Sequence, residues 1–146
     1  MNVYAYSRDK FTDYIMSYGV DPTQYYISII SSGGPKGIPV INGQHDNVLT
    51  IAFDDVLESG KQWGNDIKAF YPAVAITEEQ AQKLHDFIEA IPLNSNVHVH
   101  CVYGQSRTGA VAKYLQEYRD ATVHNITLEK YNDRVFRLLK HTARPR

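Results

Sequence analysis

The sequence predicts an α/β fold in which a central, mainly parallel β-sheet of four to five strands is flanked by α-helices. Two observations support this prediction. Short runs rich in β-branched and aromatic residues alternate along the chain with segments in which apolar residues recur every three or four positions. The 146 residues also contain no internal repeat, low-complexity tract or obvious linker, so we expect one domain spanning residues 1–146.

The first strand and the first helix are expected before residue 20. Residues 2–6 are expected to form a short strand, and Ser7 then provides a suitable cap for a helix that Gly19 closes. Within this helix the apolar side chains recur at helical spacing, at Phe11, Tyr14, Ile15 and Tyr18.

Two further strands are expected in the first half of the chain. Residues 25–30, YYISII, are a β-branched and aromatic run that ends at the strong breaker SSGGPKG, which indicates a buried strand leading into a loop. Residues 48–53, VLTIAF, form a second run of this type, which ends at Asp54 and Asp55.

The segment from Val56 to Ala75 has an irregular pattern, which predicts a long surface connection with room for a single helical turn. Loops of this length in a compact domain are usually functional or mobile. Thr77 to Gln80 then has the form of a capping box, so a helix is expected to follow. The apolar stripe of this helix consists of Ala81, Leu84, Phe87 and Ile88.

The last third of the chain is expected to contain one strand and two helices. The strand spans residues 97–100 and runs directly into residues 101–109, CVYGQSRTG. The helix that follows is expected to place four residues on one face: Val111, Ala112, Leu115 and Tyr118. The final helix is expected to span about residues 127–141, with a basic end that suits the helix dipole. Its inward residues are expected to be Leu128, Tyr131, Val135, Leu138 and Leu139.

Composition excludes some classes of function. The formal net charge of −1 gives no general attraction to nucleic acid or to a membrane surface. The single cysteine excludes an internal disulfide, and no Cys/His pair has the spacing of a structural zinc site, so no metal and no other cofactor is expected. The first residues lack the apolar core of a signal peptide, and no run is long enough to span a bilayer. We therefore expect the cytoplasm of its own cell or of a host.

The segment around Cys101 predicts an anion site. A buried strand that turns through a short loop into a helix directs several backbone N–H groups toward one point, with the positive end of the helix behind them. Cys101 lies where the strand ends and Arg107 where the helix begins, so both can address the same anion. The residues expected to bind a phosphate are Val102, Tyr103, Gly104, Gln105, Ser106 and Arg107.

The same groups predict a reactive thiol. Backbone amides and a guanidinium stabilise a thiolate, so Cys101 is expected to be a nucleophile at neutral pH. Thr108 could donate its hydroxyl to the sulfur and help it to leave. His100 is expected to brace the loop by hydrogen bonds from beneath.

The string HCVYGQSRTG resembles the signature of the cysteine-dependent protein tyrosine phosphatases, in which His-Cys is followed after five residues by Arg and then Ser or Thr. The short chain resembles the dual-specificity branch, and within it the compact phosphatases of bacteria and their phages. The resemblance implies a dual-specificity-phosphatase-like fold and a cysteinyl-phosphate intermediate. It implies phosphorylated proteins as substrates, with phosphotyrosine as the main target and phosphoserine and phosphothreonine left open.

The resemblance also implies an aspartic acid that protonates the leaving oxygen and later activates water. Aligning VLTIAF with the corresponding family strand places Asp55 in this role, with Asp54 as the alternative. The connection after Asp55 is longer than in the small dual-specificity enzymes. Asp66, which lies on this connection, is therefore an outside candidate for the general acid.

Three other interpretations compete with this one. A lone cysteine at a strand end is usually a small buried hydrophobe, although the flanking histidine, glycine and arginine make a coincidence improbable here. Some viral relatives of the fold, with a similar loop, suggest an RNA 5′-phosphatase, but the near-zero net charge argues against it, because RNA binding normally shows a basic stripe. The third is a catalytically inactive module that recognises phosphorylated partners.

Overall fold

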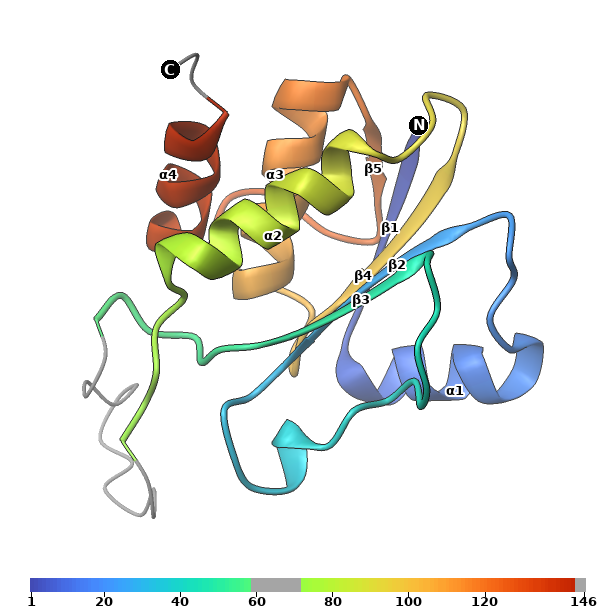
Figure 1. Ribbon diagram of the computed structural model, residues 1–146, viewed down its shortest axis with the longest axis horizontal. Helices are drawn as coiled ribbons and strands as arrows, with labels where there is room; N and C mark the ends of the chain where they lie inside the picture. Colours follow the sequence, from blue (N-terminus) through green and yellow to red (C-terminus); the bar gives the residue numbers. More distant parts are fainter. Residues whose placement is uncertain (59–71, 144–146) are drawn as a thin grey trace.

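The computed structural model describes residues 1–58 and 72–143, which contain one sheet of five strands and four α-helices (Figure 1). The strands are β1 Asn2–Tyr6, β2 Tyr25–Ile30, β3 Val48–Ala52, β4 Asn96–His100 and β5 Thr122–His124. The helices are α1 Arg8–Tyr18, α2 Glu78–Glu89, α3 Ser106–Arg119 and α4 Asp133–Thr142, with a short 3-10 helix, η1, at Pro35–Gly37. The strand order is β3-β2-β4-β1-β5 and every pairing is parallel, which confirms the predicted α/β fold class.

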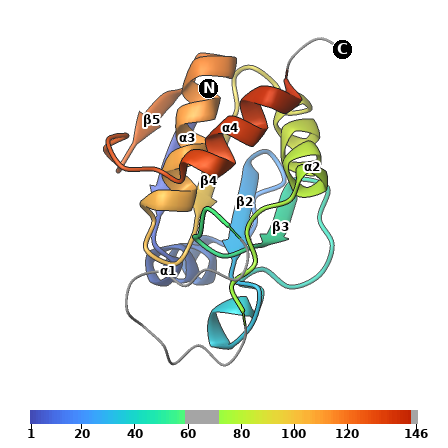
Figure 2. The ribbon, with the colours of Figure 1, turned by 90° about the vertical axis from the view of Figure 1, so that its left-hand side faces the viewer.

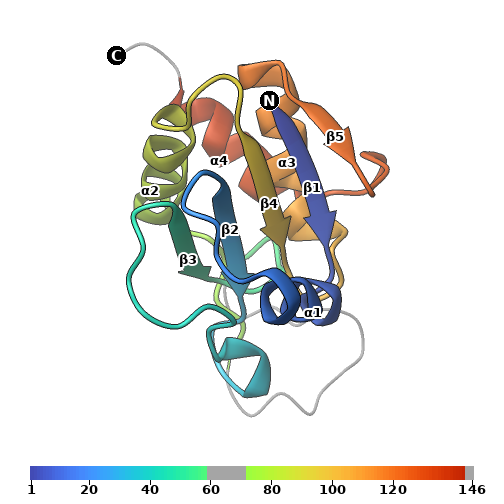
Figure 3. The ribbon, with the colours of Figure 1, turned by 90° about the vertical axis from the view of Figure 1, so that its right-hand side faces the viewer.

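The helices cover the two faces of the sheet unequally. Helices α2, α3 and α4 lie together on one face, and α1 lies on the other, as the two side views show (Figure 2 and Figure 3). Within the described ranges, no helix has both the length and the apolar character required to cross a bilayer.

Local signals set most element boundaries. The Ser7 side chain accepts a hydrogen bond from the Lys10 amide and begins α1. Thr77 and Gln80 form the predicted capping box, each side chain accepting from the other's amide at 3.1 Å, which begins α2. The four predicted strands and the first three predicted helices are confirmed, with ends that differ by one or two residues.

The end of the chain departs from the prediction. Helix α4 begins at Asp133 and not near Thr127, because the side chain of Asn132 accepts a hydrogen bond from the Val135 amide at 3.1 Å and caps the helix there. Tyr118 is 39% exposed and so does not belong to the inner face of α3. Strand β5 was not predicted, since three residues are too few to give a periodic signal. Most of the segment from Val56 to Ala75, for which a long connection with one helical turn was expected, lies outside the described residues, at 59–71.

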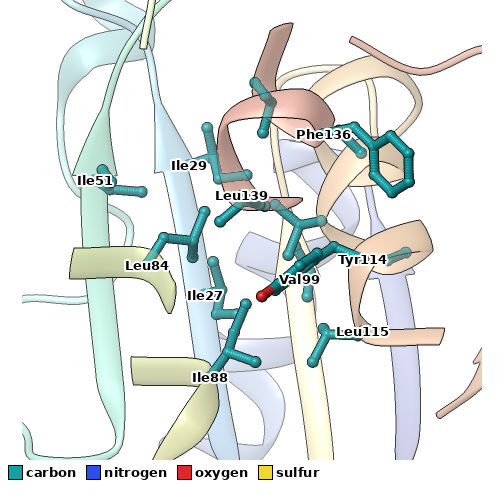
Figure 4. Close-up of a cluster of buried hydrophobic side chains, with 14 of the residues drawn as sticks. Ile27, Ile29, Ile51, Leu84, Ile88, Val99, Tyr114, Leu115, Phe136 and Leu139 are labelled. Carbon is teal, nitrogen blue, oxygen red and sulfur yellow. The ribbon is translucent and has the colours of Figure 1, made fainter. Parts of the chain in front are cut away.

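The core holds β4 on both faces. The larger cluster lies between the sheet and α2, α3 and α4 (Figure 4), and its members include Ile27, Ile29, Leu84, Ile88, Val99, Leu115 and Leu139. A smaller cluster of Phe11, Tyr26 and Ile41 lies on the side of α1, where Phe11 stacks on His100 and Tyr26 on His98, both residues of β4. Each fully buried side chain of this size contributes about 1.5–3 kcal/mol. Because both faces of β4 are packed, the position of its carboxyl end is fixed, and Cys101 follows directly from it.

Candidate functional site

The loop between β4 and α3 lies where the connections from two adjacent strands pass to opposite faces of the sheet. Strand β4 pairs with β1 and β2, so the ends of three parallel strands meet at the same edge of the sheet. After β1 the chain passes to α1 on one face, and after β4 it passes to α3 on the other (Figure 3). Ligands of open α/β sheets bind in the crevice at such a point. The predicted anion loop therefore occupies the usual ligand position of this architecture.

Cys101 and Arg107 line one pocket at this edge. Both are nearly inaccessible, with exposed fractions of 2% and 4%. The pocket also brings in Asp54 and Asp55 from the segment after β3, and Tyr131 from the segment before α4. Residues far apart in the sequence thus meet around the thiol.

Hydrogen-bond donors surround the loop. The first N–H groups of α3 have no partner within the helix, and the helix begins directly after the loop, at Ser106. The guanidinium of Arg107 is anchored by a hydrogen bond from Nη1 to the Phe53 carbonyl at 2.8 Å. Among the described residues, Nε of Arg107 and the hydroxyl of Thr108 are buried without a hydrogen-bond partner. Because buried donors are almost always satisfied, these two favour a site that binds an acceptor-rich group.

His100 holds the beginning of the loop. A carbonyl oxygen can only accept, so Nδ1 of His100 donates to the Cys101 carbonyl at 3.1 Å, and Nε2 then accepts from the Ser28 hydroxyl at 2.6 Å. Burial lowers the pKa of His100 to about 4, so the ring is neutral at pH 7. The ring also stacks on Phe11, with the ring centroids 4.3 Å apart. The histidine is therefore placed to fix the loop from the sheet side and lies within the core.

Gly104 allows the loop to approach the start of α1. Its φ is +71°, and a Cβ atom at this position would lie 2.6 Å from the Ser7 nitrogen and from the carbonyl of Tyr6. These are backbone atoms of the β1–α1 junction and cannot rotate away. Only glycine fits here without displacing the loop.

We expect Gly104→Ala to lower the stability of the protein. Gly19 supplies a matched control, because its φ is +69° but a Cβ atom there would meet nothing within 4 Å. Gly19→Ala should cost only backbone strain, roughly 1–3 kcal/mol. Gly104→Ala should add an overpacking cost of about 1–3 kcal/mol. Urea unfolding of both variants measures this, and equal losses of unfolding free energy in the two would contradict the close contact at Gly104.

The two aspartates after β3 have different surroundings. The carboxylate of Asp54 accepts from the Ser32 amide at 3.0 Å, from the Ser32 hydroxyl at 2.5 Å and from the Val74 amide at 2.8 Å. Asp54 thus joins two loop segments. Asp55 instead contacts the start of α3, since its Oδ1 accepts from the Ser106 hydroxyl at 2.7 Å. Of the two, Asp55 is the one attached to the anion loop.

Comparisons with known proteins give no relative of this chain. No family model, no curated protein and no solved structure matches it. The function therefore has to be inferred from the residues of the site and their geometry.

Some residues of the site were not predicted from the sequence. Asn132 donates from Nδ2 to Asp55 Oδ1 at 2.9 Å, although the sequence places it inside a helix. Its type was the available signal, because asparagine is favoured as a helix cap. Asp66, the outside candidate for the acid, falls outside the described residues. Within residues 1–58 and 72–143, no group of three or more His, Cys, Asp or Glu residues is placed to hold a metal ion.

Proposed function

We propose that the protein is a phosphatase that removes phosphate from protein side chains through a covalent intermediate on Cys101. One observation carries this proposal: a buried thiol and a buried guanidinium lie at the two ends of a loop that leads into a helix N-terminus. Both residues line the same pocket, and Arg107 and the loop amides are the groups that would donate hydrogen bonds to the oxygens of a phosphate dianion bound there. A free thiol of this kind also suits a reducing compartment such as the cytoplasm.

In the first step the Cys101 thiolate attacks phosphorus, an S–P bond forms, and the bond from phosphorus to the substrate oxygen breaks. The protonated carboxyl of Asp55 gives its proton to that oxygen, so the substrate leaves as an alcohol or a phenol. The amides of the loop and Arg107 stabilise the charge on the transferring group in both states.

In the second step water attacks the phosphocysteine. Asp55, now a carboxylate, takes a proton from this water while the S–P bond breaks and the sulfur leaves as a thiolate. Thr108 follows Arg107 at the start of α3, and its hydroxyl, which has no hydrogen-bond partner in residues 1–58 and 72–143, is the proposed donor to that sulfur. Inorganic phosphate is released, and the carboxyl of Asp55 is again protonated.

The proposal predicts phosphate release without metal. We expect turnover of p-nitrophenyl phosphate and of a phosphotyrosine peptide in buffer that contains excess EDTA, because every group used in the reaction is a protein side chain or amide. A 5′-triphosphorylated RNA oligonucleotide is the comparison substrate, and it should be a poor one. Faster release from the RNA than from the peptide would favour an RNA phosphatase, and peptide binding without any release would favour a binding module.

A further inference from the structure

Asn132 connects the three segments that make up the site. Its side chain is buried, with an exposed fraction of 4%. Its Nδ2 donates to Asp55 Oδ1 at 2.9 Å and to the Val56 carbonyl at 3.3 Å. Its amide donates to the Ser106 carbonyl at 3.0 Å, and the Ser106 hydroxyl donates in turn to Asp55 Oδ1. Asp55, Ser106 and Asn132 therefore form a closed ring of hydrogen bonds.

The ring treats the two oxygens of Asp55 differently. Oδ1 accepts from both Ser106 and Asn132, whereas Oδ2 has no hydrogen bond to the described residues. An oxygen that accepts two hydrogen bonds acts as the carbonyl oxygen of a carboxylic acid. When Asp55 is protonated, the proton consequently resides on Oδ2.

We infer that Asn132 is the positioning residue of the general acid: it fixes Asp55 so that Oδ2 carries and delivers the proton. This inference rests on the proposed function. It adds Asn132 to the site, a residue that the sequence of the loop after β4 does not indicate. The cap of α4 uses the Oδ1 atom of Asn132, which accepts from Val135, while the contact with Asp55 uses Nδ2. The two roles can therefore be separated by substitution.

Two variants of Asn132 keep the cap and remove the donor. Serine and aspartate are both good helix caps, so α4 should still begin at Asp133. In Asn132→Ser the side chain is too short to reach both Asp55 and the Val56 carbonyl. In Asn132→Asp a carboxylate replaces the amide donor and lies next to the carboxyl group of Asp55. For a phosphate ester with a strongly basic leaving oxygen, such as an alkyl phosphate, kcat/KM of both variants should fall roughly ten- to a hundredfold, part of what a general acid supplies.

The leaving group distinguishes positioning from a structural role. With p-nitrophenyl phosphate, whose leaving oxygen needs little protonation, kcat/KM of both variants should stay close to wild type, because kcat/KM reports formation of the phosphocysteine and not its hydrolysis. Arg134→Ala is the matched control, because Arg134 also joins α4 to neighbouring loops, through the Ile76 carbonyl at 3.0 Å, but does not contact Asp55. Any loss of kcat/KM in Arg134→Ala should be the same for both esters. Thermal unfolding of all variants reports any general loss of structure.

A double mutant completes the test. In an Asp55→Asn background, Asn132→Ser should cause no further loss, because a positioning residue acts only through the group that it positions. Equal losses of the Asn132 variants on both esters, or full additivity with Asp55→Asn, would overturn the positioning role while leaving the phosphatase proposal intact. No phosphate release by the wild-type protein from any ester would overturn the proposed function, and this inference with it.

Discussion

Cys101→Ser is expected to lose at least about 10⁴-fold in phosphate release, because the substitution removes the proposed covalent nucleophile and with it the main path of the proposed reaction. A serine hydroxyl is not ionised at neutral pH and is a weak nucleophile unless an adjacent base activates it. Binding should survive, because Arg107 and the loop amides are unchanged. The variant is therefore expected to hold a phosphopeptide without turning it over.

Two measurements check this expectation. Phosphate release from a phosphotyrosine peptide gives the loss in turnover, and calorimetric titration with the same peptide gives the affinity. Acid quenching of the wild-type protein during turnover should trap phosphate on the chain, and mass spectrometry should find it at Cys101, the only cysteine. A variant that keeps more than a hundredth of the wild-type rate, or trapped phosphate on another residue, would rule out the thiol as nucleophile.

The fold was largely predictable because its signals are local. Apolar runs bounded by breakers gave β2 and β3, and caps such as Thr77 gave the helix starts. The start of α4 was not predictable in the same way. Its apolar periodicity extends back to Leu128, so the pattern alone also allows an earlier start. In the structure Asn132 caps the helix that begins at Asp133, and the same side chain is held by a long-range hydrogen bond to Asp55. Tertiary contacts thus decided between two helix starts that the local pattern allowed.

The candidate site likewise has a part that the local sequence predicts and a part that depends on tertiary contacts. Cys101 and Arg107 belong to one continuous segment, so their joint position follows from a strand, a short loop and a helix. The choice between Asp54 and Asp55 depends on partners from elsewhere in the chain. Ser32 and Val74 hold the first, whereas residues of the α3 and α4 starts hold the second. No local pattern in the sequence contains that information.

Asp55→Asn is expected to reduce kcat/KM, which reports the first step of the proposed reaction, by about 10²–10⁴ on an ester with a strongly basic leaving oxygen, and far less on p-nitrophenyl phosphate. The substitution is nearly isosteric, and the amide oxygen can still accept from Ser106 and Asn132, so the loop should keep its structure. What is lost is the transferable proton. A loss that grows with the basicity of the leaving oxygen is the signature of a missing general acid.

Asp54→Asn is the matched control, since it makes the same chemical change one residue away. Asp54 holds Ser32 and Val74, so this variant should lose stability, and any loss of turnover should be the same for both esters. Steady-state rates on the two esters, with urea unfolding of each variant, separate these outcomes. If the loss of rate depended on the leaving group in Asp54→Asn but not in Asp55→Asn, the general acid would be Asp54 and not Asp55. Only removal of the residue that donates the proton makes the loss of rate depend on the basicity of the leaving oxygen.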